Sequence, residues 1–143
     1  MKWPRNPATL LQEGPHIPIL ISASRYELGE GRAVGLDYPE WPIQALIDTG
    51  ASVTLINPEI AKTCKLRWTG RATIVAVGGM SGEYPEHAAA ISFPGTELPG
   101  FDVIRVVACP IIRRKFACLI GRDILQKFQL LYDGRTGDVE IRA

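Results

Sequence analysis

The chain has 143 residues, of which 46% are hydrophobic and 22% charged, and its formal net charge is +1. A chain of this length can bury about two thirds of its unfolded surface in one core, so a single soluble domain is expected. The near-neutral charge gives no electrostatic attraction for nucleic acid, and no apolar run approaches the roughly 20 residues of a membrane helix. We therefore expect neither a nucleic-acid partner nor a membrane.

The cysteines and the N-terminal stretch bear on the compartment. Cys64, Cys109 and Cys118 are odd in number and lack the CxxC spacing of a metal site, which favours free, mostly buried thiols. Pro and Asn residues interrupt the continuous apolar core that a signal peptide would need near the N-terminus. We expect a cytoplasmic protein that uses no cofactor and no metal.

The first third of the chain is expected to lead, through strands, to one acidic motif. Residues 1–15 are rich in Pro and polar residues, so we expect an N-terminal arm outside the core, partly disordered, and a domain formed by residues 16–143. The other expected elements are a strand over 17–22, a loop or solvated hairpin over 25–32, a short strand over 33–36, a break over 39–42 and a strand over 43–47.

The rest of the chain is expected to be mainly β, with one or two short helices. Asn57, Pro58 and Glu59 supply a cap, a favoured first residue and an acid in the first turn, which predicts a helix to about residue 63. A strand over 71–77, a glycine-rich tip at 78–82 and a return over 87–93 predict a hairpin. The later expected elements are strands over 101–109, 129–132 and 138–142, a loop over 110–115 and a strand-to-helix turn over 116–125.

The acidic motif interrupts an apolar run. The run stops at Asp48, passes through Thr49, Gly50, Ala51 and Ser52, and then resumes. An ionised carboxylate in an apolar setting is costly, so it normally has a charged partner or a function. Thr49 offers a hydroxyl for hydrogen bonding, and Gly50 lets the backbone turn or be approached closely. Asp-Thr-Gly also occurs in ordinary turns, so its context must decide between a plain loop and an active-site loop.

Three segments together resemble the retropepsin type of aspartic protease. They are Asp48-Thr49-Gly50, the hairpin tip at 78–82, which resembles a substrate-covering flap, and residues 116–125. In the third segment, Leu119-Ile120-Gly121 resemble the stretch of two apolar residues and a glycine that crosses beneath the catalytic loop, and the short C-terminal helix follows it. The resemblance implies an all-β, barrel-like acid-protease fold with one or two short helices, functional as a twofold homodimer. A plain surface hairpin and an ordinary strand-to-helix turn remain the alternatives for the second and third segments.

The resemblance also implies a reaction. Aspartic endopeptidases use two carboxylates that share one proton, and the chain has one Asp-Thr-Gly motif, so the second carboxylate would come from a second copy. An activated water would hydrolyse a peptide bond between apolar residues of an extended substrate. The strand over 138–142, in which Val139 and Ile141 alternate with charged neighbours, is the expected intersubunit strand. The alternative is a retropepsin-fold module for dimerisation or peptide binding with little or no proteolytic activity.

The roles of single residues follow from the same resemblance. Asp48 would be the catalytic acid and base, Thr49 would hydrogen-bond across the twofold axis, and Gly50 would contact the substrate backbone. The expected substrate-binding residues are Leu46, Ala51, Leu55, Gly78, Gly79, Met80, Ala117 and Leu119, and the expected supporting residues are Ser52, Gly121, Arg122 and Asp123. Retroviral members often have an acid in place of Ser52 that pairs with the arginine, so the partner of Arg122 stays open.

Overall fold

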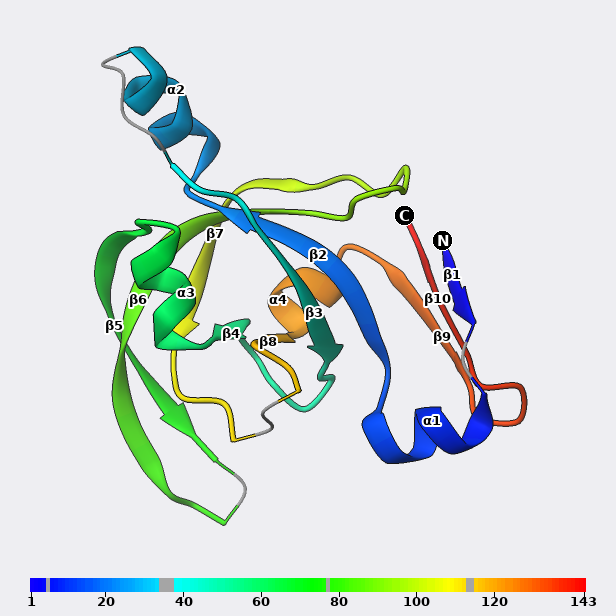
Figure 1. Cartoon of the computed structure of the whole chain (residues 1–143). Helices are drawn as coiled ribbons and strands as arrows, with labels where there is room; N and C mark the ends of the chain where they lie inside the picture. The colour runs from blue at the N-terminus through cyan, green and yellow to red at the C-terminus, as the bar shows by residue number, and fades with distance from the viewer. Residues whose placement is uncertain (5, 34–37, 77, 113–114) are drawn as a thin grey trace.

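The computed structural model describes residues 1–4, 6–33, 38–76, 78–112 and 115–143 (Figure 1). Strands dominate the described chain, as predicted, and the helices are short. The strands are β1 (Lys2–Pro4), β2 (His16–Ser22), β3 (Trp41–Ile47), β4 (Leu55–Ile56), β5 (Arg67–Val75), β6 (Ser81–Ser92), β7 (Phe101–Ala108), β8 (Cys118–Ile120), β9 (Gln129–Asp133) and β10 (Asp138–Arg142). The helices are α1 (Pro7–Glu13), α2 (Arg25–Ala33), α3 (Pro58–Thr63) and α4 (Arg122–Leu125).

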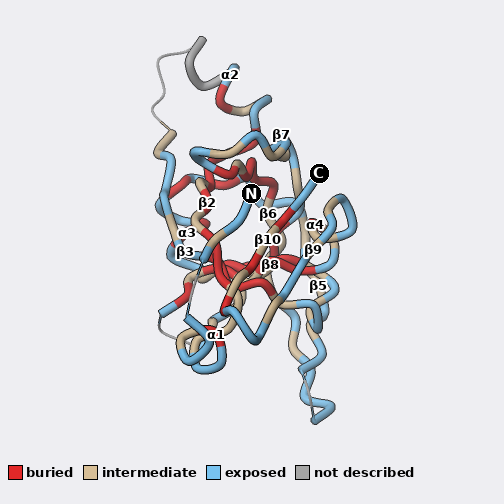
Figure 2. Tube along the Cα trace, turned by 90° about the vertical axis from the view of Figure 1, so that its right-hand side faces the viewer, coloured by how far each residue is buried: buried red, intermediate tan, exposed pale blue. Residues whose placement is uncertain are grey.

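The larger sheet has the strand order β2-β3-β8-β4-β7-β6-β5. Strand β2 pairs with β3 along most of its length and then, through Leu20–Ser22, with β6. This second pairing joins one edge strand of the sheet to a strand near its other edge, so the sheet curls around its own interior. Figure 2 shows the consequence: buried residues gather along the central strands, whereas the end of the β5–β6 hairpin is exposed.

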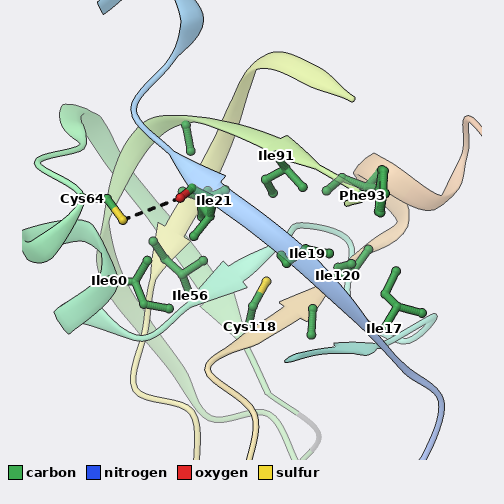
Figure 3. Close-up of a cluster of buried hydrophobic side chains, with 14 of the residues drawn as sticks. Ile17, Ile19, Ile21, Ile56, Ile60, Cys64, Ile91, Phe93, Cys118 and Ile120 are labelled. Atoms are coloured by element: carbon green, nitrogen blue, oxygen red, sulfur yellow. Dashed lines mark hydrogen bonds between the residues drawn. The ribbon is translucent and has the colours of Figure 1, made fainter. Parts of the chain in front are cut away.

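The core fills the interior of this curled sheet. Alternate residues of β2, namely Ile17, Ile19 and Ile21, are fully buried and meet residues of β4, β6 and β8 (Figure 3). Each such side chain contributes about 1.5–3 kcal/mol when it is removed from water. The thiols of Cys64 and Cys118 are free and buried in this core, as predicted, and burial raises the pKa of both.

The first fifteen residues differ from the expected arm. Strand β1 pairs antiparallel with β10, and α1 places Leu10 in the core at 1% exposure. Asn6 caps α1 because its Oδ1 accepts a hydrogen bond from the Thr9 N–H at 2.7 Å, and Pro7 occupies the first turn. The Pro-rich composition that suggested an arm therefore includes a helix-start signal.

Helix α2 replaces the loop or hairpin expected over 25–32. Its first turn is closed by Ser24, whose Oγ accepts a hydrogen bond from the Glu27 N–H at 3.4 Å, and Leu28 is buried. Glu27 also pairs with Arg67 of β5 at 2.7 Å. Ser followed three residues later by Glu is a capping-box pattern, which is the signal that sequence reasoning overlooked.

The region between α2 and the acidic motif also differs from expectation. The short strand expected over 33–36 falls on Ala33, the last residue of α2, and on residues outside the described part of the chain. The break expected over 39–42 is wrong because β3 starts at Trp41 and includes Pro42. Strand β8 pairs only with residues 45–47 of β3. Pro42 lies outside this pairing, so its lack of an N–H costs no hydrogen bond to β8.

The smaller sheet corrects the expectation for the last strand. Its order is β1-β10-β9, so both edges of β10 are already paired within the chain. Val139 and Ile141 of β10 are buried in the same core as β2. The proposed intersubunit strand over 138–142 is therefore wrong, and removal of this strand would open the core. Figure 1 places this sheet beside the two chain ends, with β1 and β9 at its edges.

Candidate active site

The two strands that flank the Asp48 loop both pair with one short strand, β8. Strand β3, which precedes the loop, pairs parallel with β8, and β4, which follows it, pairs antiparallel with β8. Leu119 at the centre of β8 lies opposite both Leu46 and Leu55. The Asp48 N–H continues the ladder by donating to the Ile120 carbonyl at 2.9 Å. Because both ends of the loop are hydrogen-bonded to one strand, the position of the Asp48 backbone is fixed.

The Asp48 carboxylate turns back onto its own loop. Its Oδ1 accepts a hydrogen bond from the Gly50 N–H at 2.9 Å, and the Ala51 N–H donates to the Asp48 carbonyl at 3.2 Å. A Cβ on residue 50 would approach that Oδ1 to 3.1 Å, so Gly50 leaves the carboxylate room. Asp48 is half-buried, whereas Thr49 and Gly50 are exposed. The loop therefore presents a rigid carboxylate and two small residues at the surface of one chain.

A buried hydroxyl supports the loop from beneath. Thr54 is 0% exposed, and its Oγ1 donates to Asp123 Oδ1 at 2.8 Å and accepts from the Gly121 N–H at 3.1 Å. The Thr54 N–H donates to the other oxygen of Asp123 at 2.9 Å. Asp123 thus holds the end of the loop through two bonds. Sequence reasoning named Asp123 and Gly121 but missed Thr54, whose only signal was a hydroxyl within an apolar run.

Arg122, whose partner the sequence left open, contacts the backbone of the same loop. Its Nη1 donates to the Thr49 carbonyl at 2.7 Å, and its N–H donates to the Ala51 carbonyl at 2.9 Å. The Arg122 guanidinium thus has a hydrogen-bond acceptor in the loop backbone and needs no carboxylate at position 52, where the chain has an exposed serine. The two bonds hold the loop on either side of Gly50.

Two cavities flank the carboxylate. The larger, of about 720 Å³, is lined by Gly14, Pro15, Leu46, Ile47, Asp48, Leu55, Pro110, Ile111, Ile112 and Leu119. The smaller, of about 470 Å³, is lined by Asp48, Gly50, Ala51, Ser52, Val53, Leu55, Thr73, Ile74, Val75, Ala76 and Cys109. Asp48 and Leu55 belong to both, so the carboxylate lies between two mainly apolar hollows. Both volumes fall in the range of about 300–1,000 Å³ that is usual for ligand sites.

The β5–β6 hairpin reaches this region with its stem. Thr73 to Ala76, at the end of β5, line the smaller cavity, and the Ala76 N–H donates to the Met80 carbonyl at 2.8 Å. Gly78 and Gly79 have φ values of 97° and 82°, which L side chains rarely adopt. Met80 is 79% exposed. Gly78, Gly79 and Met80 do not line either cavity.

Four of the predicted substrate-binding residues, Ala117 and the three at the hairpin tip, line neither cavity, and the structure adds other residues to the site. Ala117 lines neither cavity, and its carbonyl accepts the Asn57 N–H at 2.9 Å. Asn57 is the N-cap residue of α3, as predicted, but its side chain makes no capping bond. Its Oδ1 instead accepts a hydrogen bond from the Ile111 N–H at 2.8 Å and so holds the loop that follows β7. Ile111 and Ile112 of that loop line the larger cavity, and two adjacent isoleucines in an expected loop were the available signal. Residues 113–114 of the loop predicted over 110–115 lie outside the described part of the chain.

Two further findings concern the described residues alone. They contain no group of three or more His, Cys, Asp and Glu side chains that could hold a metal ion. In the same ranges, every helix is too short or too polar to cross a membrane.

Comparisons with known proteins give one family and one fold. The chain matches the family described as "gag-polyprotein putative aspartyl protease" over residues 39–127, a span that includes the Asp48 loop, the hairpin and α4. DNA damage-inducible protein 1 from two strains of Cryptococcus neoformans var. neoformans serotype D is 30% identical over 107 residues, 70% of this chain and 23% of that protein. The chain thus spans about a quarter of the length of the curated relatives it matches.

Two solved structures share the arrangement of strands. A retropepsin-like aspartic protease from Rickettsia conorii has a TM-score of 0.55 at 17% identity, and the match covers 97% of this chain and 86% of that one. The EIAV protease complexed with the inhibitor HBY-793 has a TM-score of 0.52 at 23% identity, with 82% of this chain and 89% of that one covered. Both likenesses show that the chain shares their fold.

Proposed function

Since the chain belongs to the retropepsin-like family of aspartic proteases, we propose that it is an aspartic endopeptidase whose active site is shared by two copies. The predicted fold, mostly β with a few short helices, is confirmed. One observation carries the proposal: a rigidly held Asp48 lies at the surface between two apolar cavities. That placement suits a carboxylate that must meet both a peptide bond and a second carboxylate.

The need for a second copy follows from the chemistry of the site. Among the described residues that line the two cavities, Asp48 is the one acid. Hydrolysis by this route requires a charged carboxylate that takes a proton from water and a protonated carboxylate that hydrogen-bonds the scissile carbonyl. Thr49 and Gly50 are exposed beside Asp48, so a twofold axis at this loop would bring two Asp48 side chains together. Thr49 would then contact its counterpart across the axis.

The proposed steps use the contacts of the loop. Arg122 and Asp123 hold the backbone on both sides of Gly50, so the carboxylate is positioned before substrate binds. The charged carboxylate takes a proton from water, the water oxygen attacks the carbonyl carbon, and the protonated partner hydrogen-bonds the developing oxyanion. When the tetrahedral intermediate collapses, the C–N bond breaks and the carboxyl that took the proton from water gives it to the leaving amine. The apolar cavities on either side favour apolar residues next to the cleaved bond of an extended peptide.

The subunit contact needs a strand other than β10. Among the described strands, β1 and β9 are the outer strands of the smaller sheet, each paired with β10, and Leu131 and Tyr132 of β9 are 48% and 51% exposed. We propose that one of these outer strands contributes to the homodimer. The free thiols of Cys64, Cys109 and Cys118 favour a reducing compartment, and we propose the cytoplasm.

The proposed function is tested by cleavage and assembly in one experiment. The protein is incubated with a proteome-derived peptide library from about pH 4 to about pH 7, where a carboxylate pair with one shared proton is active. Specific activity is then measured across a dilution series beside sedimentation. We expect cleavage between apolar residues, highest on the acid side of neutrality, with activity that falls as monomers accumulate. A monomer with undiminished specific activity would overturn the shared site, and peptide binding without cleavage would support the binding-module alternative.

The flap role of the hairpin gives a separate prediction. Val at positions 78 and 79 would force a β-branched residue into positive φ, at a cost of about 1–3 kcal/mol each. We expect Gly78→Val/Gly79→Val to lower kcat/KM about tenfold or more at temperatures where the protein is still folded, with an unfolding temperature lowered only by this local strain. Met80→Asp, at an exposed position, should raise KM and leave the unfolding temperature unchanged. Gly134→Ala, in an exposed turn where φ is ordinary, is the matched control. Unchanged kinetics in both hairpin variants would show that the hairpin does not cover substrate.

A further inference from the structure

A third cavity, of about 570 Å³, lies between α3 and the stem of the flap hairpin. We call it the α3 cavity. Its floor consists of apolar residues from α3, β6 and the end of β7, and its polar wall residues are Lys62, Lys65, Tyr84 and His87. An apolar hollow with a few convergent polar groups is the usual form of a binding site. Asp48 does not line the α3 cavity, which distinguishes it from the two cavities of the candidate active site.

The charged side chains among the described residues that line the α3 cavity have one sign. Two ammonium groups, those of Lys62 and Lys65, belong to its wall, and none of the described residues that line it is acidic. A carboxylate would therefore enter a positive environment with an apolar floor. Among the residues that the structure describes, nothing in this wall would repel it by like charge.

Lys65 occupies a position that glycine usually fills. It follows the C-cap of α3 with φ of 52°, the only positive φ at a described residue other than glycine. The Leu66 N–H donates to the Ala61 carbonyl at 2.9 Å and the Lys65 N–H to the Lys62 carbonyl at 3.2 Å, which is the Schellman pattern. A lysine in this conformation costs free energy that glycine would not. The side chain that lines the cavity is therefore kept at a site where backbone preference opposes it.

His87 adds an unsatisfied polar atom. Its Nδ1 is buried without a hydrogen-bond partner, although buried polar atoms in folded proteins nearly always have one. Burial lowers the pKa of the imidazole, so the ring is neutral at neutral pH. Its cross-strand neighbour on β5 is Trp68, which is 61% exposed. Trp68 does not line the cavity but neighbours it through this strand pairing, and tryptophan is enriched among the residues that carry binding energy at protein interfaces.

The α3 cavity adjoins the candidate active site. Pro110 lines both the α3 cavity and the larger cavity beside Asp48. Strand β6, which carries Tyr84 and His87, continues into the flap tip. An extended chain advances about 3.3 Å per residue, so a polypeptide that leaves the larger cavity past Pro110 can reach the α3 cavity within a few residues.

We propose that the α3 cavity is an exosite that binds an acidic, partly apolar segment of the protein substrate, outside the residues that flank the cleaved bond. The proposal rests on the proposed endopeptidase function. A glutamate or aspartate of the segment would pair with Lys62 and Lys65, and an adjacent apolar side chain would lie on the floor. The exosite would thereby select substrates by a feature distant from the cleavage site.

The test measures binding apart from turnover. The full chain carrying Asp48→Asn is titrated by calorimetry with the best-cleaved library peptide, extended at either end by Leu-Glu-Glu-Leu or by the uncharged Leu-Gln-Gln-Leu. We expect the acidic extension at one end to lower Kd about tenfold relative to the uncharged extension. In the same background, Lys62→Gln and Lys65→Gly should each remove most of this gain. Lys127→Gln, an exposed lysine outside the α3 cavity, should preserve it.

Several outcomes decide the matter. Lys65→Gly puts the preferred residue at positive φ, so its unfolding temperature should equal or exceed that of the parent, and loss of binding then reflects the missing ammonium. An equal Kd for acidic and uncharged extensions would overturn the exosite and leave the endopeptidase proposal intact. Octanoate, a carboxylate with an apolar tail, serves as a competitor for the cavity. If octanoate binds but leaves the gain from the acidic extension unchanged, the extension does not occupy the cavity, and the proposal is overturned. If the wild type cleaves nothing, an acidic library peptide that binds through Lys62 and Lys65 supports the site while refuting the protease.

Discussion

Asp48→Asn is expected to reduce kcat at least about a thousandfold, because an amide cannot accept the proton of the attacking water. The fold should persist, since the side-chain oxygen of asparagine can still accept the Gly50 N–H that now bonds Asp48 Oδ1 at 2.9 Å. The measurement is the initial rate of cleavage of the best library peptide, together with the far-UV spectrum and the unfolding temperature. Full activity in a pure Asp48→Asn preparation would refute the catalytic assignment.

Asp102→Asn is the matched control for this change. Asp102 is exposed on β7, where it makes a surface ion pair with Arg25 at 3.7 Å, and such pairs contribute little stability. We expect its activity and its unfolding temperature to equal those of the wild type. Both variants lose one carboxylate charge, so a difference in activity between them would come from the position of the acid and not from the loss of charge.

Mixing the Asp48→Asn chain with the wild type tests the shared site directly. When equal amounts exchange subunits freely, about a quarter of the dimers contain two Asp48 carboxylates, so activity should fall to about half of that of the wild-type subunits present. Activity that stays proportional to the amount of wild-type chain after exchange would place the catalytic partner of Asp48 within one chain.

Sequence alone pointed to those parts of the candidate site whose residues lie close together in the chain as short motifs. Asp48 and Gly50 belong to one tripeptide, and residues 119–123 contain the strand and helix start that hold it. The partner of Arg122 could not be predicted because it is a backbone carbonyl, which any residue offers. Thr54 was missed for a related reason: its value comes from contact with Asp123 and Gly121, which are far away in sequence.

Errors in the predicted fold arose where local composition competes with distant pairing. The Pro-rich start suggested an arm, but β1 finds its partner in β10 at the other end of the chain. Strand β10 was expected to have a free edge because alternation shows which face of a strand is buried but not how many neighbours the strand has. Helix α2 was predictable in principle, since the spacing of Ser24 and Glu27 is a capping signal that was outweighed by weak periodicity.

Gly121→Ala is expected to damage both the stability and the activity of the protein. A Cβ at residue 121 would lie 2.5 Å from the carbonyl carbon and oxygen of Val53, where ordinary contacts begin at 3.4 Å. Its φ of -89° is one that any residue adopts, so the cost comes from contact alone. The obstacle is the backbone of the Asp48 loop, which must therefore move. We expect a loss of about 3 kcal/mol in the free energy of unfolding.

Gly29→Ala is the control for Gly121→Ala. Gly29 is exposed within α2, and a Cβ there would meet nothing within 4 Å, so alanine should stabilise the helix by about 0.5–1 kcal/mol. Activity should be unchanged in this variant. In Gly121→Ala, a loop displaced by about 1 Å would lower kcat/KM about a hundredfold at temperatures where the protein is still folded. Chemical denaturation and peptide cleavage measured on both variants would decide, and a Gly121→Ala protein as stable and as active as the wild type would show that β8 and α4 do not hold the Asp48 loop in place.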